Sequence, residues 1–173
     1  LIAEGRAIIA RNVRRKNVHP IGIGENLRTK VNANVGTSPD LCDLELEVKK
    51  AKVAVEYGAN TVMDLSTGGD LDKIRRAILK AVEVPVGTVP IYQSAIEAAR
   101  EKGSIVHMTE DDIFKAIEKH AKDGVDFMTV HCGVTKRTVE KISKHPRLMG
   151  IVSRGGTFLA AWILHNEKEN PLY

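Results

Sequence analysis

The sequence has few cysteines and no long apolar run. Cys42 and Cys132 are its two cysteines among 173 residues. Two cysteines cannot form a framework of several disulfides, and these two are too far apart to make a Cys-x-x-Cys metal site. No uninterrupted apolar stretch reaches the about 20 residues that a membrane-spanning helix requires, and no signal peptide is visible. These absences argue against a membrane protein and favour a reducing cytoplasm.

Aromatic residues are also scarce, at 4% of the chain. A protein that binds single-stranded nucleic acid usually stacks bases on such side chains, so few stacking platforms are available. The net charge is +4, from 26 Lys and Arg against 22 Asp and Glu, and the one dense basic patch covers residues 11–17. A solvated surface or a site for anionic small molecules explains this excess better than a nucleic-acid interface.

The length fits one domain with a sizeable core, yet a complete eight-fold β/α barrel needs about 200 residues or more. The chain starts at Leu1 without an initiator Met and stops at Tyr173, directly after a helix-like stretch. We therefore expect residues 1–173 to be a single, partial catalytic domain and a piece of a longer polypeptide.

Five short apolar runs each end in a polar cluster, and a helix-like segment follows each run. This repeat predicts an α/β fold of the β/α-barrel type, with five to six of its units present. The five runs should be parallel neighbours in one barrel-like sheet, with functional side chains at the carboxyl ends of the strands. The expected strands are residues 30–35, 61–65, 85–89, 127–131 and 150–153, with a sixth candidate at 7–12.

Helical spacing of apolar residues and capping residues predict the intervening helices. Ser38 or Asp40 is expected to cap the first helix and Asp70 the second. Thr109, with Asp112 three residues later, resembles a capping box. The segments His19-Pro20 and 22–24 carry turn signals. The expected helices cover residues 44–55, 70–79, 94–102, 113–122, 135–144 and 157–165.

Polar residues at the first two strand ends allow two interpretations. Asn32 and Asn34 point to the same face of an extended strand, where they could bind the polar edge of a ligand or form an Asx-turn. Met63 is typical of a core position. Asp64 and Ser66 lie on the opposite face from Met63 and could cap the following helix.

His131 is the best acid–base candidate from the pattern alone, because it ends a strand and its ordinary pKa lies near neutrality. A structural role is equally compatible with this position. Cys132 alternates to the opposite face, which argues against a Cys–His catalytic couple. The remaining histidines are expected on the surface: His19, His107, His120, His145 and His165.

Ser153, Arg154, Gly155 and Gly156 give the strongest physical signal. The glycines would let backbone approach a ligand, and a helix starting at Thr157 would point free N–H groups outward. The guanidinium supplies a planar cation for phosphate. We favour anion binding here over a glycine-rich turn with an exposed arginine.

Taken together, the motifs resemble one family, the phosphomethylpyrimidine synthases. The match runs in order along nearly the whole chain. It comprises residues 5–9 (GRAII), 28–38 (RTKVNANVGTS), 58–69 (GANTVMDLSTGG), 84–93 (VPVGTVPIYQ), 124–134 (GVDFMTVHCGV), 150–156 (GIVSRGG) and 165–173 (HNEKENPLY).

The resemblance implies a (β/α)8 barrel and a radical rearrangement of 5-aminoimidazole ribotide to 4-amino-5-hydroxymethyl-2-methylpyrimidine phosphate in thiamine biosynthesis. It also implies S-adenosylmethionine, a 4Fe–4S cluster, a zinc-type divalent metal and a homodimer. The family's substrate contacts fall on Asn34, Met63, Tyr92, His131, Ser153, Arg154 and Gly155.

The family's metal-ligand histidines, its three-cysteine cluster motif and its Asp-Gly-Leu-Arg-Pro-Gly segment would lie beyond Tyr173. Cys42 and Cys132 do not match the cluster motif. Two alternatives remain: a phosphate-binding barrel aldolase or isomerase, and a truncated domain that only binds ligand or associates with a partner. An aldolase would require a Schiff-base lysine at a strand end, whereas Lys30 lies at the start of its strand.

Overall fold

The computed structural model describes residues 1–173, which form two compact units. Residues 1–88 and 118–128 make up the first, called here the sheet unit. Residues 89–117 and 129–173 make up the second, the helical unit. Helix α4 (Glu110–Asp123) contributes its first part to the helical unit and its last six residues to the sheet unit.

The sheet unit contains a parallel four-stranded sheet with the strand order β3-β4-β5-β6. The strands are β3 (Asn32–Val35), β4 (Thr61–Asp64), β5 (Val86–Thr88) and β6 (Phe127–Met128). Sequential neighbours in parallel order confirm four of the five predicted strands and their pairing. Strand β6 ends at Met128, so residues 129–131, which were expected in this strand, form a loop.

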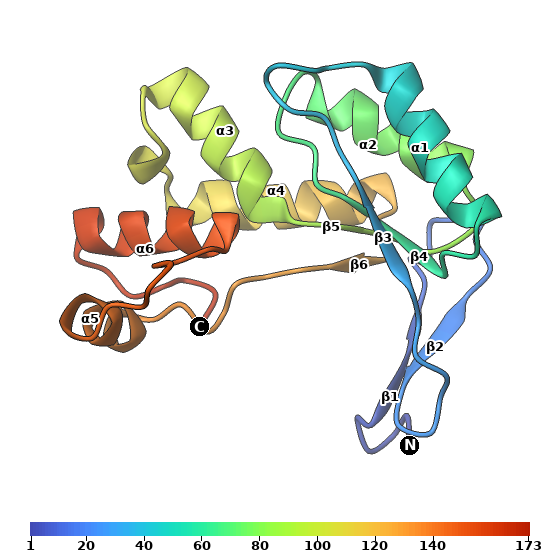
Figure 1. Cartoon of the computed structure of the whole chain (residues 1–173), viewed down its shortest axis with the longest axis horizontal. Helices are drawn as coiled ribbons and strands as arrows, with labels where there is room; N and C mark the ends of the chain where they lie inside the picture. The colour runs from blue at the N-terminus through green and yellow to red at the C-terminus, as the bar shows by residue number, and fades with distance from the viewer. The chain divides into compact units, whose positions relative to one another are not determined.

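Helices α1 (Leu44–Glu56) and α2 (Leu71–Ala81) pack side by side on this sheet (Figure 1). Between them and the strands lies the apolar core, which excludes water. Asp70 caps α2 as predicted, since its side chain accepts from Lys73 N. The core comprises Val35, Ala51, Val62, Ile74, Ile78, Leu79, Val82, Val86 and Val125.

The predicted cap of the first helix is wrong. Asp43 occupies this position and accepts from Leu46 N at 3.0 Å. Ser38 instead exchanges backbone hydrogen bonds with Leu41 in an isolated antiparallel bridge, so the chain cannot yet be helical at residues 38–41.

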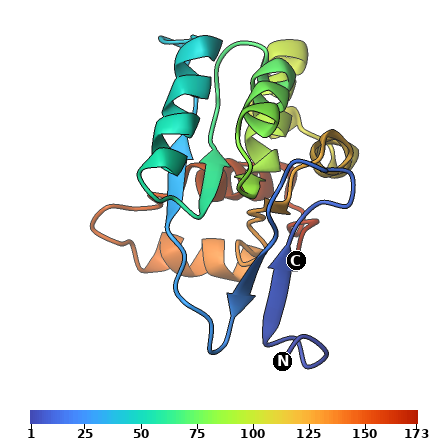
Figure 2. The ribbon, with the colours of Figure 1, turned by 90° about the vertical axis from the view of Figure 1, so that its right-hand side faces the viewer.

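A second, antiparallel sheet consists of β1 (Ala7–Ala10) and β2 (Ile21–Gly24) and lies apart from the four-stranded sheet (Figures 1 and 2). The candidate strand at 7–12 therefore forms, but as part of a hairpin. The turn predicted at 22–24 is wrong, because Ile21 and Ile23 alternate with glycines and pair across the hairpin with Ala10 and Ile8.

The helical unit contains α3 (Pro90–Lys102), the short 3-10 helix η1 (Ile105–His107), α5 (Lys136–Lys144) and α6 (Arg154–Asn166), besides the start of α4. Helix α3 begins four residues earlier than predicted because Pro90 takes the first helical position, where its missing N–H costs nothing. Thr109 and Asp112 exchange side-chain-to-backbone hydrogen bonds, which confirms the capping box at α4.

The helical unit is organised around α6. Trp162 is 2% exposed and its indole N–H donates to the carbonyl of Met108 at 2.7 Å. Leu159 and Ile163 are buried on the same helix. The Trp162 hydrogen bond therefore connects α6 to the segment between η1 and α4.

The fifth predicted strand, at residues 150–153, is wrong. These residues carry no strand, and α6 begins directly after them at Arg154. A strand is stable only when it is paired in a ladder. The helical unit has no strand with which this segment could pair.

The fold class is thus α/β, with one parallel four-stranded sheet. None of the helices combines the length and apolar character needed to cross a bilayer.

Candidate functional site

The sheet unit brings two predicted site residues together. Asn34 and Met63 are direct partners in the β3–β4 register, one residue before the end of each strand. Met63 is 7% exposed, which agrees with a core position. The amide of Asn34 is exposed and has no hydrogen-bond partner, whereas Asn32 accepts from the hydroxyl of Thr61 at 2.8 Å. Asn34 is thus the free amide at the carboxyl end of β3.

The loops that follow β3 and β4 are joined by buried hydrogen bonds. Thr37 N donates to Ser66 Oγ at 3.2 Å, and Ser66 Oγ donates to Asp64 Oδ1 at 2.5 Å. The Thr37 hydroxyl donates to the carbonyl of Gly68 at 2.6 Å. Asp64 and Ser66 therefore hold the two loops together, and they do not take the alternative role of capping the next helix. Asp70 has that role.

The loops approach so closely that residue 36 must be glycine. Gly36 has φ 151°, and a Cβ there would lie 2.6 Å from the backbone of Leu65 and Ser66. Asp64 is almost fully buried, and this burial raises the pKa of its carboxyl above the ordinary value. The hydrogen bonds from Ser66 and the charge of Arg75 lower the pKa in the opposite direction, and the nearby Glu47 raises it further.

The helical unit brings the other predicted site residues together at the start of α6. The imidazole of His131 lies against the backbone of Gly155, where a Cβ would overlap the ring. Gly155 and Gly156 are buried within the first helical turn. The small residue at 155 therefore makes room for a side chain of the protein itself.

The sequence-based interpretation of residues 153–156 needs a correction. They were expected to form an open loop before a helix at Thr157, but Ser153 is the N-cap of α6. Its hydroxyl accepts from Gly156 N at 3.1 Å, and its carbonyl accepts from Thr157 N at 2.8 Å. The serine hydroxyl thus satisfies one of the free N–H groups of a helix that carries two glycines in its first turn.

Arg154 is held over an aromatic ring. Its guanidinium carbon lies 5.3 Å from the centroid of Tyr92, in the range of a cation–π contact. Tyr92 in turn meets Phe158 edge to face, with 6.2 Å between the ring centroids. Arg154 is exposed. The cation is thus oriented by stacking while its N–H groups remain accessible to an anion.

His131 is partly buried, and its Nδ1 atom is inaccessible and lacks a hydrogen-bond partner. Burial lowers the pKa of His131 below the ordinary value of 6.5. The ring is therefore neutral at pH 7 and can offer one donor or one acceptor to a ligand.

The prediction of a surface position is wrong for one histidine, His120. His120 is 4% exposed and lies between Thr88 and Arg75. Arg75 Nη1 is 3.0 Å from His120 Nε2, and Thr88 Oγ1 is 2.8 Å from His120 Nδ1. Because arginine can only donate, Nε2 accepts and Nδ1 carries the proton toward Thr88. Burial, helped by the charge of Arg75, lowers the pKa of His120 to about 3.

A signal for this burial was present in the sequence. Ile113, Ala116 and His120 recur at helical spacing, and all three are buried in the structure. The other four histidines are exposed, as predicted: His19, His107, His145 and His165.

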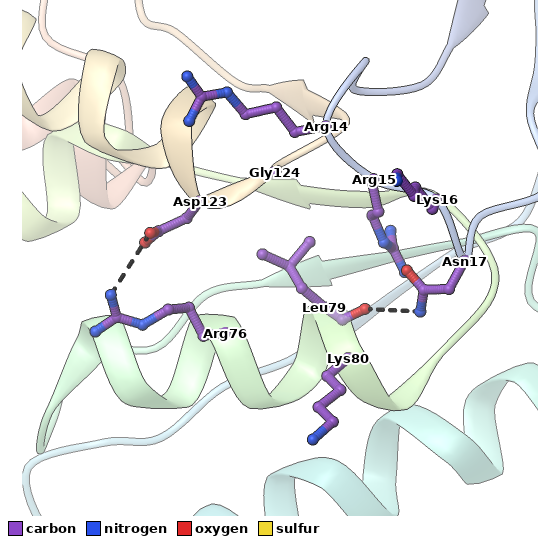
Figure 3. A pocket seen from close by; sticks show the side chains of 9 residues that line it. All are labelled: Arg14, Arg15, Lys16, Asn17, Arg76, Leu79, Lys80, Asp123 and Gly124. Atoms are coloured by element: carbon purple, nitrogen blue, oxygen red, sulfur yellow. Dashed lines mark hydrogen bonds and ion pairs between the residues drawn. The ribbon is translucent and has the colours of Figure 1, made fainter.

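A cleft of about 550 Å³ opens elsewhere on the sheet unit (Figure 3). None of the predicted site residues lines it. The lining residues are Arg14, Arg15, Lys16, Asn17, Arg76, Leu79, Lys80, Asp123 and Gly124.

Segment 12–17, which holds most of the basic patch noted in the sequence, forms one wall of this cleft and caps two helices. Arg15 donates to the carbonyls of Val82 and Val84 beyond the end of α2. Asn17 reaches Leu79 O in the last turn of α2 (Figure 3), and Asn12 reaches Ala121 O in the last turn of α4. Helix C-termini leave free carbonyls that such donors satisfy. Arg15, one of the basic residues of this patch, therefore has a structural role in the fold.

No group of three or more His, Cys, Asp or Glu side chains is arranged to hold a metal ion. Cys42 lies in the sheet unit and Cys132 in the helical unit, and both are free and exposed.

Comparisons with known proteins match the whole chain to one family. The model of the Radical SAM ThiC family matches residues 1–173. Phosphomethylpyrimidine synthase from Pyrococcus abyssi is 62% identical over 173 residues, which are all of this chain and 40% of that protein. The enzymes of the same name from Methanocaldococcus jannaschii and Thermodesulfovibrio yellowstonii are 59% and 60% identical, again over 40% of their lengths. The chain thus spans about 40% of the curated relatives that it matches, and it belongs to the Radical SAM ThiC family.

Proposed function

We propose that this chain is part of a phosphomethylpyrimidine synthase, and that it supplies much of the substrate site. The reaction is the radical rearrangement of 5-aminoimidazole ribotide to 4-amino-5-hydroxymethyl-2-methylpyrimidine phosphate. Support comes from family membership over the whole chain and from the names of relatives about 60% identical.

The observation that carries the proposal is the arrangement at the start of α6. His131, Tyr92 and Arg154 are far apart in sequence, yet His131 contacts Gly155 and Arg154 stacks on Tyr92. A neutral imidazole, a phenol and an oriented guanidinium can together bind a ligand that carries a polar ring and a phosphate.

We assign the anionic end of the substrate to Arg154 and the α6 N-terminus. The guanidinium offers two parallel N–H groups to phosphate, and the helix adds its partial positive charge. We assign the imidazole ring and ribose to His131 and Asn34, and a contact along the substrate to Met63. Ser153 contributes by capping α6, and Gly155 contributes by leaving space for the imidazole of His131.

We further propose that β3–β6 are four strands of a (β/α)8 barrel. The parallel order of consecutive strands and the helices α1 and α2 between the first three support this. Asn34 and Met63 would then lie at the carboxyl ends of barrel strands, where the active sites of such barrels are found.

The residues present do not fit the family's iron–sulfur cluster. A 4Fe–4S cluster needs three or four cysteine thiolates, whereas Cys42 and Cys132 lie singly in different units. When bound, S-adenosylmethionine and the cluster supply the radical, and we place their ligands and those of the zinc-type metal outside this segment. A homodimer in the cytoplasm is the assembly that family membership favours.

The test is anaerobic turnover by the full-length enzyme, with aminoimidazole ribotide and S-adenosylmethionine, followed by mass spectrometry of the pyrimidine phosphate. We expect product from the unaltered enzyme and a loss of at least tenfold in kcat/KM for His131→Ala. The control Arg100→Lys changes an exposed residue paired with Glu101 and should be neutral. Absence of product from a cluster-loaded unaltered enzyme would refute the proposal.

A further inference from the structure

The segment after α6 carries a motif to which the proposed function gives no role. The family-like ending at residues 165–173 (HNEKENPLY) begins in the last turn of α6 and continues past it. Glu167 ends the helix in the left-handed conformation, with φ 53°. The chain then turns back beneath α6 within the helical unit (Figure 1).

Asn170 is the buried residue of this segment. It is 3% exposed, which is unusual for an amide and requires that its polar atoms be satisfied. Its Nδ2 donates to the backbone carbonyl of His131 at 2.8 Å, and its Oδ1 accepts from Leu172 N at 3.0 Å. Asn170 thus joins a self-stabilised turn to the residue whose ring is proposed to face the substrate.

Glu169 holds the other end of the same loop. Its Oε1 accepts from Lys136 N, the first residue of α5, at 3.0 Å, and from Asn170 N at 2.8 Å. A carboxylate at this position is also favoured by the helix dipole of α5. The ammonium of Lys136 returns a hydrogen bond to the carbonyl of Glu167 at 3.0 Å. Segment 167–170 therefore forms hydrogen bonds with both ends of loop 131–136, at His131 and at Lys136.

His131 is consequently fixed from two directions. Its ring rests on Gly155 in the first turn of α6, and its carbonyl is held by Asn170, which follows the last turn. The ring itself forms no hydrogen bond through Nδ1. The packing against Gly155 and the hydrogen bond from Asn170 to the backbone therefore hold the residue in place.

From these contacts we infer that Asn170, assisted by Glu169, is a positioning residue that holds His131 in place for substrate. This inference rests on the proposed function of the site. Asn170, the buried amide of motif 165–173, then has a role in the substrate site as well as in stabilising the segment after α6.

The test uses two matched substitutions in the full-length enzyme. Asn170→Asp keeps the size and the Oδ1 acceptor but places an oxygen against the carbonyl of His131. Asn166→Asp removes hydrogen bonds of the same kind, from Nδ2 to the carbonyls of Val106 and Trp162, both at 2.9 Å, without touching loop 131–136. Comparison of the two separates positioning from general stabilisation of this region.

The first readout is the titration of His131, observed by NMR of histidine labelled at Cε1 and assigned with His131→Gln. In Asn170→Asp we expect the ring to leave Gly155, so that its pKa rises toward 6.5, while Asn166→Asp leaves the titration unchanged. The second readout is calorimetric affinity for aminoimidazole ribotide. Loss of one positioning hydrogen bond should weaken binding by about 3- to 10-fold.

Glu169→Ala provides an independent test if Asn170→Asp fails to fold, because Glu169 is exposed. Its control is Lys168→Ala, which removes only an exposed ion pair with Glu110. We expect Glu169→Ala to shift the His131 titration in the same direction as Asn170→Asp, and Lys168→Ala to leave it unchanged.

Failure of the inference and failure of the proposed function are distinguishable. If His131→Gln binds the substrate as tightly as the unaltered enzyme, the proposed role of His131 is wrong. If His131→Gln weakens binding but Asn170→Asp behaves like Asn166→Asp in both readouts, the positioning role of Asn170 is overturned while the proposed function stands.

Discussion

The imidazole of His131 and the backbone of Gly155 are in direct contact, with no space for a side chain at position 155. This contact places a neutral histidine beside the first turn of α6. The first residue of that helix, Arg154, is an exposed cation. The geometry makes residue 155 a sensitive point for the site.

Gly155→Ala should displace His131 and weaken the binding of aminoimidazole ribotide. Forcing a methyl group into a packed contact costs typically 1–3 kcal/mol, which corresponds to about 5- to 150-fold if it is expressed in binding. Calorimetry on the full-length enzyme measures the affinity. Gly133→Ala is the matched control, since a Cβ at Gly133 meets nothing within 4 Å. Equal affinities for the two variants would contradict the prediction.

Arg154→Lys should also weaken substrate binding. Lysine keeps the charge but loses the planar fork that pairs with phosphate and the stacking on Tyr92. A charge-assisted hydrogen bond contributes roughly 1.5–3 kcal/mol, or about ten- to a hundredfold in affinity. Calorimetry with aminoimidazole ribotide measures the effect, and Arg100→Lys serves as the control. Unchanged affinity of Arg154→Lys would mean that phosphate binds elsewhere.

Local signals predicted much of the sheet unit. The strand expected at residues 85–89 forms as β5 (Val86–Thr88), and Asp70 caps α2 as expected, because both features depend on residues adjacent in sequence. The glycines at 155 and 156 were misread as a loop. Glycine disfavours a helix only weakly, and the Ser153 cap offsets that preference at the first turn.

The sequence pattern alone predicted fewer residues of the candidate site. The spacing pointed to His131 and Arg154, but Tyr92 was identified through family resemblance. Asn170 was missed because its partner, the carbonyl of His131, lies 39 positions away in the sequence. No local periodicity encodes a single long-range contact to a backbone atom.

The pKa of His120 predicts a loss of stability in acid. In the unfolded chain this residue titrates near 6.5 and in the folded protein near 3, so between these values the unfolded state binds more protons. The stabilisation is complete above about pH 6.5 and falls as the pH decreases through this window. From pH 7 to pH 4 the free energy of unfolding should decrease by about 3 kcal/mol because of this residue.

Urea unfolding at several pH values, monitored by circular dichroism, measures how the free energy of unfolding depends on pH. His120→Gln should reduce the acid sensitivity, although it is less stable at pH 7 because it disturbs the contacts to Arg75 and Thr88. The exposed His145→Gln should retain the dependence of the unaltered protein. The same slope in all three proteins would show that His120 does not control the acid response.

Ser66→Ala should loosen the loops that follow β3 and β4. The hydroxyl accepts from Thr37 N and donates to Asp64, so alanine leaves a buried N–H without its partner. An unsatisfied buried group costs about 1–3 kcal/mol, which thermal unfolding would detect. Ser143→Ala is the control, because its hydroxyl only donates to Val139 O within its own helix and alanine favours that helix. Since Asn34 and Met63 precede these loops, the affinity for aminoimidazole ribotide should fall together with stability in Ser66→Ala. A variant as stable as Ser143→Ala would mean that the hydrogen bonds of Ser66 do not hold the two loops together.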